Sequence, residues 1–252
     1  MSFDVTADAY ARFMGRFSTP LATEFADKLA PRRGQRALDV GCGPGALTQQ
    51  LVDRLGADAV SAVDPSESFV ASVRDRFPGV DVRTGVAEDL PFPDDAFDLV
   101  LAQLVVHFMT DPVTGLAEMG RVTRRGGRVA ANVWDHGGSS GPLATFWRAA
   151  RDVDPAAPDE SGLPGTREGH LGELAAAAGL RDTEPSALTV RIPFTSFEEW
   201  WEPFTFGVGP AGSYVASLDE TGRALLTERC RDLLPSAPFE ITATAWCVVA
   251  TP

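Results

Sequence analysis

The stretch Leu38-Asp39-Val40-Gly41-Cys42-Gly43-Pro44-Gly45 decides the predicted fold. It overlaps the end of a short apolar run, residues 36–40, and runs into residues 45–55, where leucines recur at helical spacing. Glycines let the chain turn sharply and let a ligand approach the backbone with no Cβ in the way. Ligands of open α/β sheets bind at the carboxyl ends of the strands, where this turn lies. The stretch therefore predicts a strand–turn–helix unit with a ligand site at the turn.

Strand and helix patterns alternate on both sides of this unit. The predicted strands are 36–40, 59–63, 80–83, 97–102 and 128–134, and the predicted helices are 45–55, 66–77 and 112–122. Such alternation indicates parallel strands joined by crossover helices on both faces of a sheet. We therefore expect an α/β, Rossmann-like core over about residues 36–135.

The pattern loosens after residue 135. Residues 154–169 are rich in Pro, Gly, Asp and Glu and suggest a loop or lid, whereas about 183–193 and 239–250 suggest closing strands. We expect a single domain over 1–252, with a small helical cap built from about 1–30 and 140–235. The aromatic stretch 194–206, which holds Trp200, Trp201, Phe204 and Phe206, has two open interpretations: hydrophobic core, or the lining of an apolar substrate pocket.

Charge and cysteine content narrow the function classes. The 252 residues carry a formal net charge of −13, which argues against a nucleic-acid partner because the phosphate backbone would be repelled. Cys42, Cys230 and Cys247 are odd in number and widely spaced, which fits neither a disulfide framework nor a zinc site. We find no signal-peptide core and no apolar run of membrane-helix length. We expect a cytoplasmic protein without a membrane partner, and its oligomeric state stays open.

An acidic residue ends the second predicted strand. Asp64 lies 23 residues after Gly41, where a carboxylate can accept both hydroxyls of a ribose. The alternative is a turn or helix-capping residue before Pro65. Ala46 replaces the last glycine of the dinucleotide pattern, but that pattern tolerates alanine. The turn and Asp64 therefore predict a ligand that contains a nucleoside, without deciding whether that ligand is a dinucleotide.

The segment between the third and fourth predicted strands makes that choice. Residues 85–98 (GVAEDLPFPDDAFD), taken with LDVGCGPG and with VDPS at 63–66, resemble the type 11 methyltransferase family, the ubiquinone/menaquinone C-methyltransferase-like branch of class I enzymes that use S-adenosylmethionine (SAM). The resemblance covers about residues 36–135 and is specific for the cofactor, not for the substrate. It implies SAM as cofactor, S-adenosylhomocysteine as product, a small-molecule substrate, and a seven-stranded, mostly parallel sheet with one antiparallel strand.

The resemblance also implies roles for single residues. The loop that holds the methionine part of SAM is matched by Gly41, Gly43 and Gly45, and its acidic start by Asp39. Asp64 matches the ribose ligand, and the adenine contacts are matched by Ala87 and Glu88. The position facing the methyl donor is matched by Gln103 and Leu104. Relatives often have Asp where this chain has Val86, so the adenine carboxylate is open between Glu88 and Asp89.

The N-terminal stretch 10–16 resembles relatives whose first helix closes over SAM. In that interpretation Tyr10 lies over the sulfonium and Arg16 pairs with the cofactor carboxylate. The alternative is ordinary helix packing with a solvated arginine.

Methyl transfer depends mostly on positioning, and an oxygen nucleophile also needs a base. His107 and His136 follow the fourth and fifth predicted strands and are the candidate catalytic residues, as base or substrate contact. A structural histidine is the alternative at both positions. No His, Asp or Glu cluster has metal-ligand spacing, so no metal site is predicted.

We expect methyl transfer to O, N or C of a small apolar or aromatic metabolite. One alternative is a SAM-binding protein without methyl transfer, such as a regulator or a cyclase. A second is an NAD-linked oxidoreductase, but a Tyr-x-x-x-Lys pair is absent, since the tyrosines are Tyr10 and Tyr214 and the sole lysine is Lys28.

Overall fold

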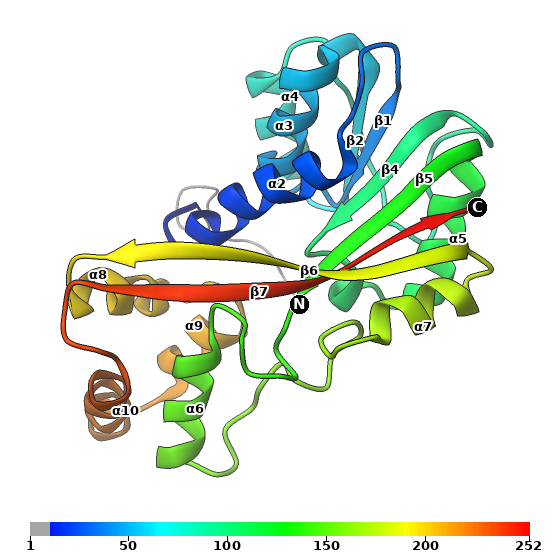
Figure 1. The fold of residues 1–252 in the computed structure, drawn as a ribbon. Coiled ribbons are helices and arrows are strands. Elements are labelled where there is room, and N and C mark those ends of the chain that lie inside the picture. Colours follow the sequence, from blue (N-terminus) through cyan, green and yellow to red (C-terminus); the bar gives the residue numbers. More distant parts are fainter. Residues whose placement is uncertain (1–10) are drawn as a thin grey trace.

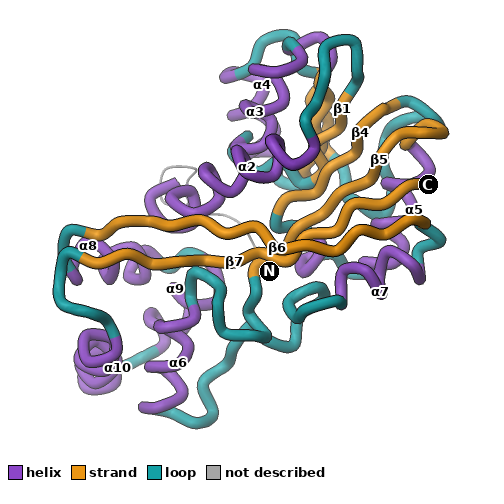
Figure 2. Tube along the Cα trace, viewed as in Figure 1, coloured by secondary structure: helices purple, strands orange, loops and turns teal. Residues whose placement is uncertain are grey.

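A seven-stranded sheet forms the centre of the computed structural model, which describes residues 11–252, with side chains from Phe13 onward (Figure 1, Figure 2). The strand order is β3-β2-β1-β4-β5-β7-β6; β7 runs antiparallel to β5 and to β6, and the other neighbouring strands are parallel. The strands are β1 (Ala37–Val40), β2 (Val60–Asp64), β3 (Asp81–Thr84), β4 (Phe97–Gln103), β5 (Thr123–Trp134), β6 (Arg181–Phe194) and β7 (Phe239–Thr251). The prediction of a Rossmann-like, mostly parallel sheet with one antiparallel strand is confirmed.

Helices cover both faces of the sheet. The first face is covered by α2 (Arg16–Leu29), α3 (Ala46–Leu55) and α4 (Glu67–Arg76), and the second by α5 (Pro112–Val122) and α7 (His170–Ala177). Successive side chains of a strand point to opposite faces. In β4, Leu101 accordingly packs with the α2 and α3 cluster and Val100 with the α5 cluster, both fully buried. This explains why β4 is apolar at nearly every position.

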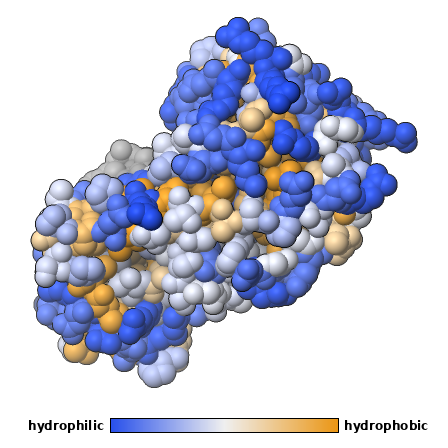
Figure 3. All heavy atoms as spheres, viewed as in Figure 1, coloured by the Kyte–Doolittle hydropathy of each residue, from blue (hydrophilic) through white to orange (hydrophobic). Residues whose placement is uncertain are grey.

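The strands β6 and β7 extend beyond the rest of the sheet. β5 pairs with β7 from Trp134 opposite Ala245 to Val129 opposite Ala250, whereas Phe239–Ala243 pair with β6 alone. This two-stranded ribbon carries the cap: α6 (Ala144–Val153), α8 (Phe197–Trp201), η4 (Glu202–Phe206), α9 (Gly209–Ser217) and α10 (Glu220–Leu233). On the face drawn in Figure 3, hydrophilic side chains cover α3 and α4, while hydrophobic ones surface along the middle of the molecule and at the cap.

Aromatic rings form the core between the cap and α2. Phe146 stacks on Phe204 with centroids 4.5 Å apart, and Trp200 lies 4.8 Å from the same ring. Phe13 contacts Phe204 edge-on at 5.0 Å. Phe204 and Trp200 are therefore core residues. None of Trp200, Trp201, Phe204 and Phe206 lines the large cavity between the sheet and the cap, which favours the core interpretation of this stretch.

Several element boundaries differ from the predicted ones. β5 begins at Thr123 and not at residue 128, because a register shift lets Thr123 pair with Phe97 ahead of the Gly126–Gly127 turn. The last cap helix, which the sequence predicts over residues 218–233, begins at Glu220, where Asp219 accepts a hydrogen bond from the amide of Gly222 at 2.7 Å. Between residues 11 and 252, the structure contains no helix with both the length and the apolar character needed to cross a membrane.

Candidate functional site

The glycine turn after β1 combines tight packing with open space. Gly41 and Gly43 both have positive φ, +68° and +51°. A Cβ on Gly41 would lie 2.5 Å from a methyl carbon of Val105, so the loop packs against the end of β4 only without a side chain there. A Cβ on Gly43 would meet no atom within 4 Å. Gly43 therefore leaves free space beside the backbone, while Gly45 lies at the N-cap of α3.

Asp64, at the end of β2, holds this turn in place by hydrogen bonds. Its carboxylate accepts hydrogen bonds from the amides of Gly43 and Ser66, each at 2.8 Å. Burial raises the pKa of Asp64, and the two backbone hydrogen bonds oppose that shift. Since Asp64 also lines the cavity beside the turn, one carboxylate holds the loop and faces the ligand space.

Asp39 is buried in the strand that leads to the turn. The hydroxyl of Thr48 donates to its Oδ2 at 2.6 Å. Burial raises the pKa of Asp39 to about 7, because desolvation outweighs the hydrogen bond from Thr48. A cationic group bound beside Asp39 would favour its ionised form.

These groups surround a cavity of about 140 Å³ at the carboxyl ends of β1, β2 and β4, which we call the loop cavity. Its lining includes Ser18, Asp39, Gly41, Cys42, Gly43, Asp64, Ser66, Gln103, Leu104 and Phe108. Gln103 donates from Nε2 to the carbonyl of Ser18 at 3.0 Å, while its Oε1 is buried without a partner in the described chain. Carboxylates, an unpartnered amide oxygen and an open glycine backbone fit a ligand with hydroxyl and ammonium groups, such as the ribose and amino acid parts of SAM.

Other predicted cofactor residues lie elsewhere. Ala87 and Glu88 do not line the loop cavity. The carboxylate of Glu88 instead accepts hydrogen bonds from the amides of Thr110 and Asp111, at 2.7 and 3.2 Å, at the start of α5. Tyr10 lies outside the described residues. The roles of Ala87, Glu88 and Tyr10 stay predictions.

Arg16, the first residue of α2, contacts other protein side chains. Its guanidinium forms an ion pair with Glu199 at 2.8 Å and lies over the Phe194 ring at 4.4 Å. It is not among the residues that line the loop cavity. The ion pair counts against the predicted contact with the cofactor carboxylate, and the role stays a prediction.

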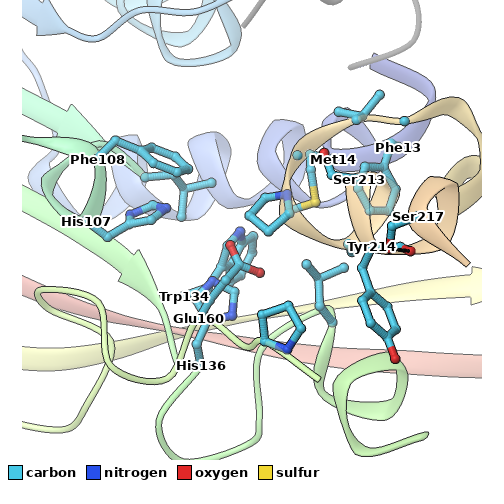
Figure 4. A pocket seen from close by; sticks show the side chains of 18 residues that line it. Phe13, Met14, His107, Phe108, Trp134, His136, Glu160, Ser213, Tyr214 and Ser217 are labelled. Carbon is cyan, nitrogen blue, oxygen red and sulfur yellow. Dashed lines mark hydrogen bonds between the residues drawn. The ribbon is translucent and has the colours of Figure 1, made fainter. Parts of the chain in front are cut away.

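A larger cavity of about 700 Å³, here the cap cavity, lies between the sheet and the cap (Figure 4). Its lining is mostly apolar and includes Phe13, Met14, Leu104, His107, Phe108, Trp134, His136, Leu143, Pro158, Glu160, Val208, Ser213, Tyr214 and Ser217. Leu104 and Phe108 line both cavities, so the two spaces adjoin at the end of β4. Leu104 has a φ of +60°, and its amide donates to the carbonyl of Asn132 at 2.9 Å. Strained backbone of this kind concentrates at binding and active sites.

The structure brings the two candidate catalytic histidines together in the cap cavity. His107 lies in the short 3₁₀ segment η3 (Val106–Phe108), and its ring centroid is 6.1 Å from that of His136. Burial lowers the pKa of His107 to about 3, and its Nδ1 is buried with no described partner. Burial also lowers the pKa of His136, against the opposing charge of Glu160. Both imidazoles are therefore neutral at physiological pH.

Glu160 is a cavity residue that the sequence did not single out. It belongs to the 154–169 segment, whose composition predicted a loop but no side-chain role. Its Oε2 accepts a hydrogen bond from the indole of Trp147 at 3.0 Å, and the residue is 5% exposed. Among residues 11–252, no group of three or more His, Cys, Asp or Glu side chains is placed to hold a metal ion.

Comparison with known proteins agrees with this geometry. Residues 38–131 match the type 11 family described as "Methyltransferase domain". An uncharacterized methyltransferase of Mycobacterium tuberculosis is 39% identical over 135 residues, which cover 54% of this chain and 52% of the relative. An uncharacterized 37.1 kDa protein of a Streptomyces fradiae transposon is 30% identical over 240 residues, covering 89% of this chain and 64% of the relative. The chain thus spans about half the length of the first curated relatives it matches.

A solved structure shows the same fold at low sequence identity. Haemonchus contortus phosphoethanolamine N-methyltransferase, in complex with phosphomonomethylethanolamine and S-adenosylhomocysteine, superimposes with a TM-score of 0.61 and 18% identity. The match covers 99% of this chain and 58% of that one. Residues 38–131 therefore match the type 11 methyltransferase domain, and the chain shares the fold of this solved methyltransferase.

Proposed function

We propose that the protein transfers a methyl group from SAM, bound in the loop cavity, to an O, N or C atom of a small apolar or aromatic molecule in the cap cavity. One observation carries this proposal: the two cavities adjoin at Leu104 and Phe108. When bound, SAM supplies a methyl group attached to a positively charged sulfur. Alignment of the acceptor with that group, away from water, can account for most of the rate.

The residues of the loop cavity bind and orient the cofactor in this proposal. Asp64 accepts the ribose hydroxyls while it holds the amide of Gly43, and Asp39 lies where it can pair with an ammonium group. The unpartnered Oε1 of Gln103 offers a further acceptor. Leu104 and Phe108 line both cavities and so mark the boundary between the cofactor space and the acceptor space.

His107 is the proposed general base for an acceptor that carries a proton. A neutral imidazole in an apolar cavity accepts a hydrogen bond from a hydroxyl or amine and so fixes its orientation. The low pKa of His107 makes it a weak base. A weak base is sufficient when the proton is lost as the new bond forms, because an alkylated hydroxyl is strongly acidic.

Calorimetry with S-adenosylhomocysteine and with NAD tests the cofactor half of the proposal. We expect micromolar binding of the first and none of the second. Asp64→Ala should weaken binding, and Asp232→Ala, an exposed position on α10, should not. Absence of S-adenosylhomocysteine binding would refute the proposal, and NAD binding in its place would restore the oxidoreductase alternative.

A screen of alcohols, phenols, amines and carbon acids with SAM then tests the transfer itself. The expected result is a gain of one methyl group in the mass of an acceptor, with equimolar S-adenosylhomocysteine. If SAM binds and an acceptor is changed without a gain of methyl, the cyclase alternative holds instead.

A further inference from the structure

The carboxylate of Glu160 lies in a mostly apolar cavity with incomplete hydrogen bonding. Its Oε2 accepts from Trp147 Nε1, and its Oε1 has no described partner. Figure 4 shows the carboxylate in the middle of the cap cavity, between His107 on one side and Tyr214 on the other. A carboxylate removed from water is costly unless a cation or several hydrogen-bond donors satisfy it.

The protein offers no cation to Glu160 from the described lining of the cap cavity. That lining contains no lysine or arginine, and both histidines are held neutral by burial. Arg151 lies near Glu160 in a small adjoining cavity, but its guanidinium is paired with Asp159 at 2.7 Å. The charge of Glu160 is therefore available to a ligand.

Aromatic rings surround the same space. Phe13, Trp134 and Tyr214 line the cap cavity, and rings of this kind accommodate both an apolar ligand body and a cation over the ring face. A phosphorylated or carboxylated acceptor would instead bring a second negative charge close to Glu160, which is unfavourable at low effective dielectric.

We propose that the cap cavity selects acceptors with an apolar ring body and a protonated amine, and that Glu160 is the specificity-determining residue that binds the amine. The inference rests on the proposed function because it takes the molecule that carries the amine to be the methyl acceptor. The amine anchors this molecule in the cavity, and the atom that receives the methyl group can be a different one.

Three matched indole compounds test the selection by calorimetry in the presence of saturating S-adenosylhomocysteine: tryptamine, tryptophol and indoleacetate. They share the ring and differ in an ammonium, a hydroxyl or a carboxylate on a short side chain. We expect tryptamine to bind at least about tenfold more tightly than tryptophol, and indoleacetate to bind most weakly. Equal binding of the three, tighter binding of indoleacetate, or binding of none would overturn the proposal.

Two variants test whether the preference for the amine comes from its contact with Glu160 or from the acidic loop as a whole. Glu160→Gln should abolish the preference for tryptamine over tryptophol while S-adenosylhomocysteine affinity stays unchanged. Glu168→Gln, exposed in the same loop, should keep the preference. A preference that survives Glu160→Gln in a folded variant would also overturn the proposal. Amine selection without any S-adenosylhomocysteine binding would leave the Glu160 site standing and remove the proposed methyl transfer instead.

Discussion

The carboxylate of Asp64 accepts a hydrogen bond from the amide of Gly43 at 2.8 Å, which links the end of β2 to the glycine turn after β1. Asp64→Ala leaves this amide and that of Ser66 without their acceptor. We expect the free energy of unfolding to fall by about 1–3 kcal/mol and S-adenosylhomocysteine to bind at least about tenfold more weakly. Urea unfolding and calorimetry measure the two effects. Unchanged affinity in a folded variant would contradict the role of Asp64.

Gly43→Ala, compared with Gly34→Ala, distinguishes the effect of backbone strain on ligand affinity from the effect of a methyl group placed in the ligand space. Gly43 and Gly34 both have positive φ, and a Cβ on either would meet no atom within 4 Å. Alanine at either position should cost on the order of 1–2 kcal/mol of stability. Only Gly43→Ala should also weaken S-adenosylhomocysteine binding, because its methyl group enters the loop cavity. Equal weakening by the remote Gly34→Ala would show that strain alone is responsible.

The contribution of Asp39 to the stability of the ligand-free protein should fall as pH rises from about 4 to 7. Burial raises its pKa from 3.8 to about 7, so the folded state keeps a proton that the unfolded state releases in this range. The stabilisation is complete below pH 3.8 and is lost as pH rises through the folded pKa, by on the order of 1 kcal/mol per pH unit. Asp39→Asn should lack this decline. Parallel curves for the two proteins in urea unfolding at pH 5 to 7.5 would disprove the assignment.

His107→Gln should reduce turnover by roughly 10²- to 10⁴-fold if the accepted proton is removed by this residue. The affinity for S-adenosylhomocysteine should stay within about twofold of the wild-type value, because His107 lines the cap cavity and not the loop cavity. Since the pKa of His107 is lowered to about 3, its protonation should cause no loss of rate between pH 8 and pH 5.

His170→Gln is the matched control for His107, since His170 begins α7 and lines neither cavity. Turnover of this control should stay near the wild-type value. Wild-type turnover in the His107 variant, measured by methyl gain in the acceptor, would remove the base role.

Phe146→Ala should destabilise the cap core. Its fully buried ring stacks on Phe204 with centroids 4.5 Å apart, so truncation leaves a cavity that costs about 3–5 kcal/mol. Leu225→Ala, at a 56% exposed position on α10, should change stability by less than about 0.5 kcal/mol. Thermal unfolding compares the two variants, and similar midpoints would show that the aromatic stack contributes little.

The sequence predicted the cofactor half of the fold because its signals are local. The glycine turn, the strand before it and the helix after it are contiguous, and Asp64 ends the next strand. The apolar run of β4 reflects burial on both faces. Such patterns depend on neighbouring residues and on a regular period, so they survive without knowledge of the tertiary structure.

The acceptor half could not be predicted in the same way, because its lining comes from distant segments. Phe13, Trp134, Glu160 and Tyr214 meet only after the cap folds over the sheet. Glu160 lies in a loop without periodicity, and buried aromatic residues look alike in sequence whether they pack in a core or line a pocket. This is why the sequence left the aromatic stretch 194–206 open between core and pocket, whereas other rings line the cap cavity.

The ribbon formed by the outer parts of β6 and β7 connects two halves with different tasks. Over Phe239–Ala243, before it reaches β5, β7 pairs with β6 alone, and the cap helices are attached to this outer part. Substitutions and insertions in the cap can therefore accumulate without altering the registers of β1, β2 and β4 that hold the glycine turn. Under the proposed function, acceptor preference can therefore change through the cap alone, while the half of the sheet that holds the glycine turn keeps its structure.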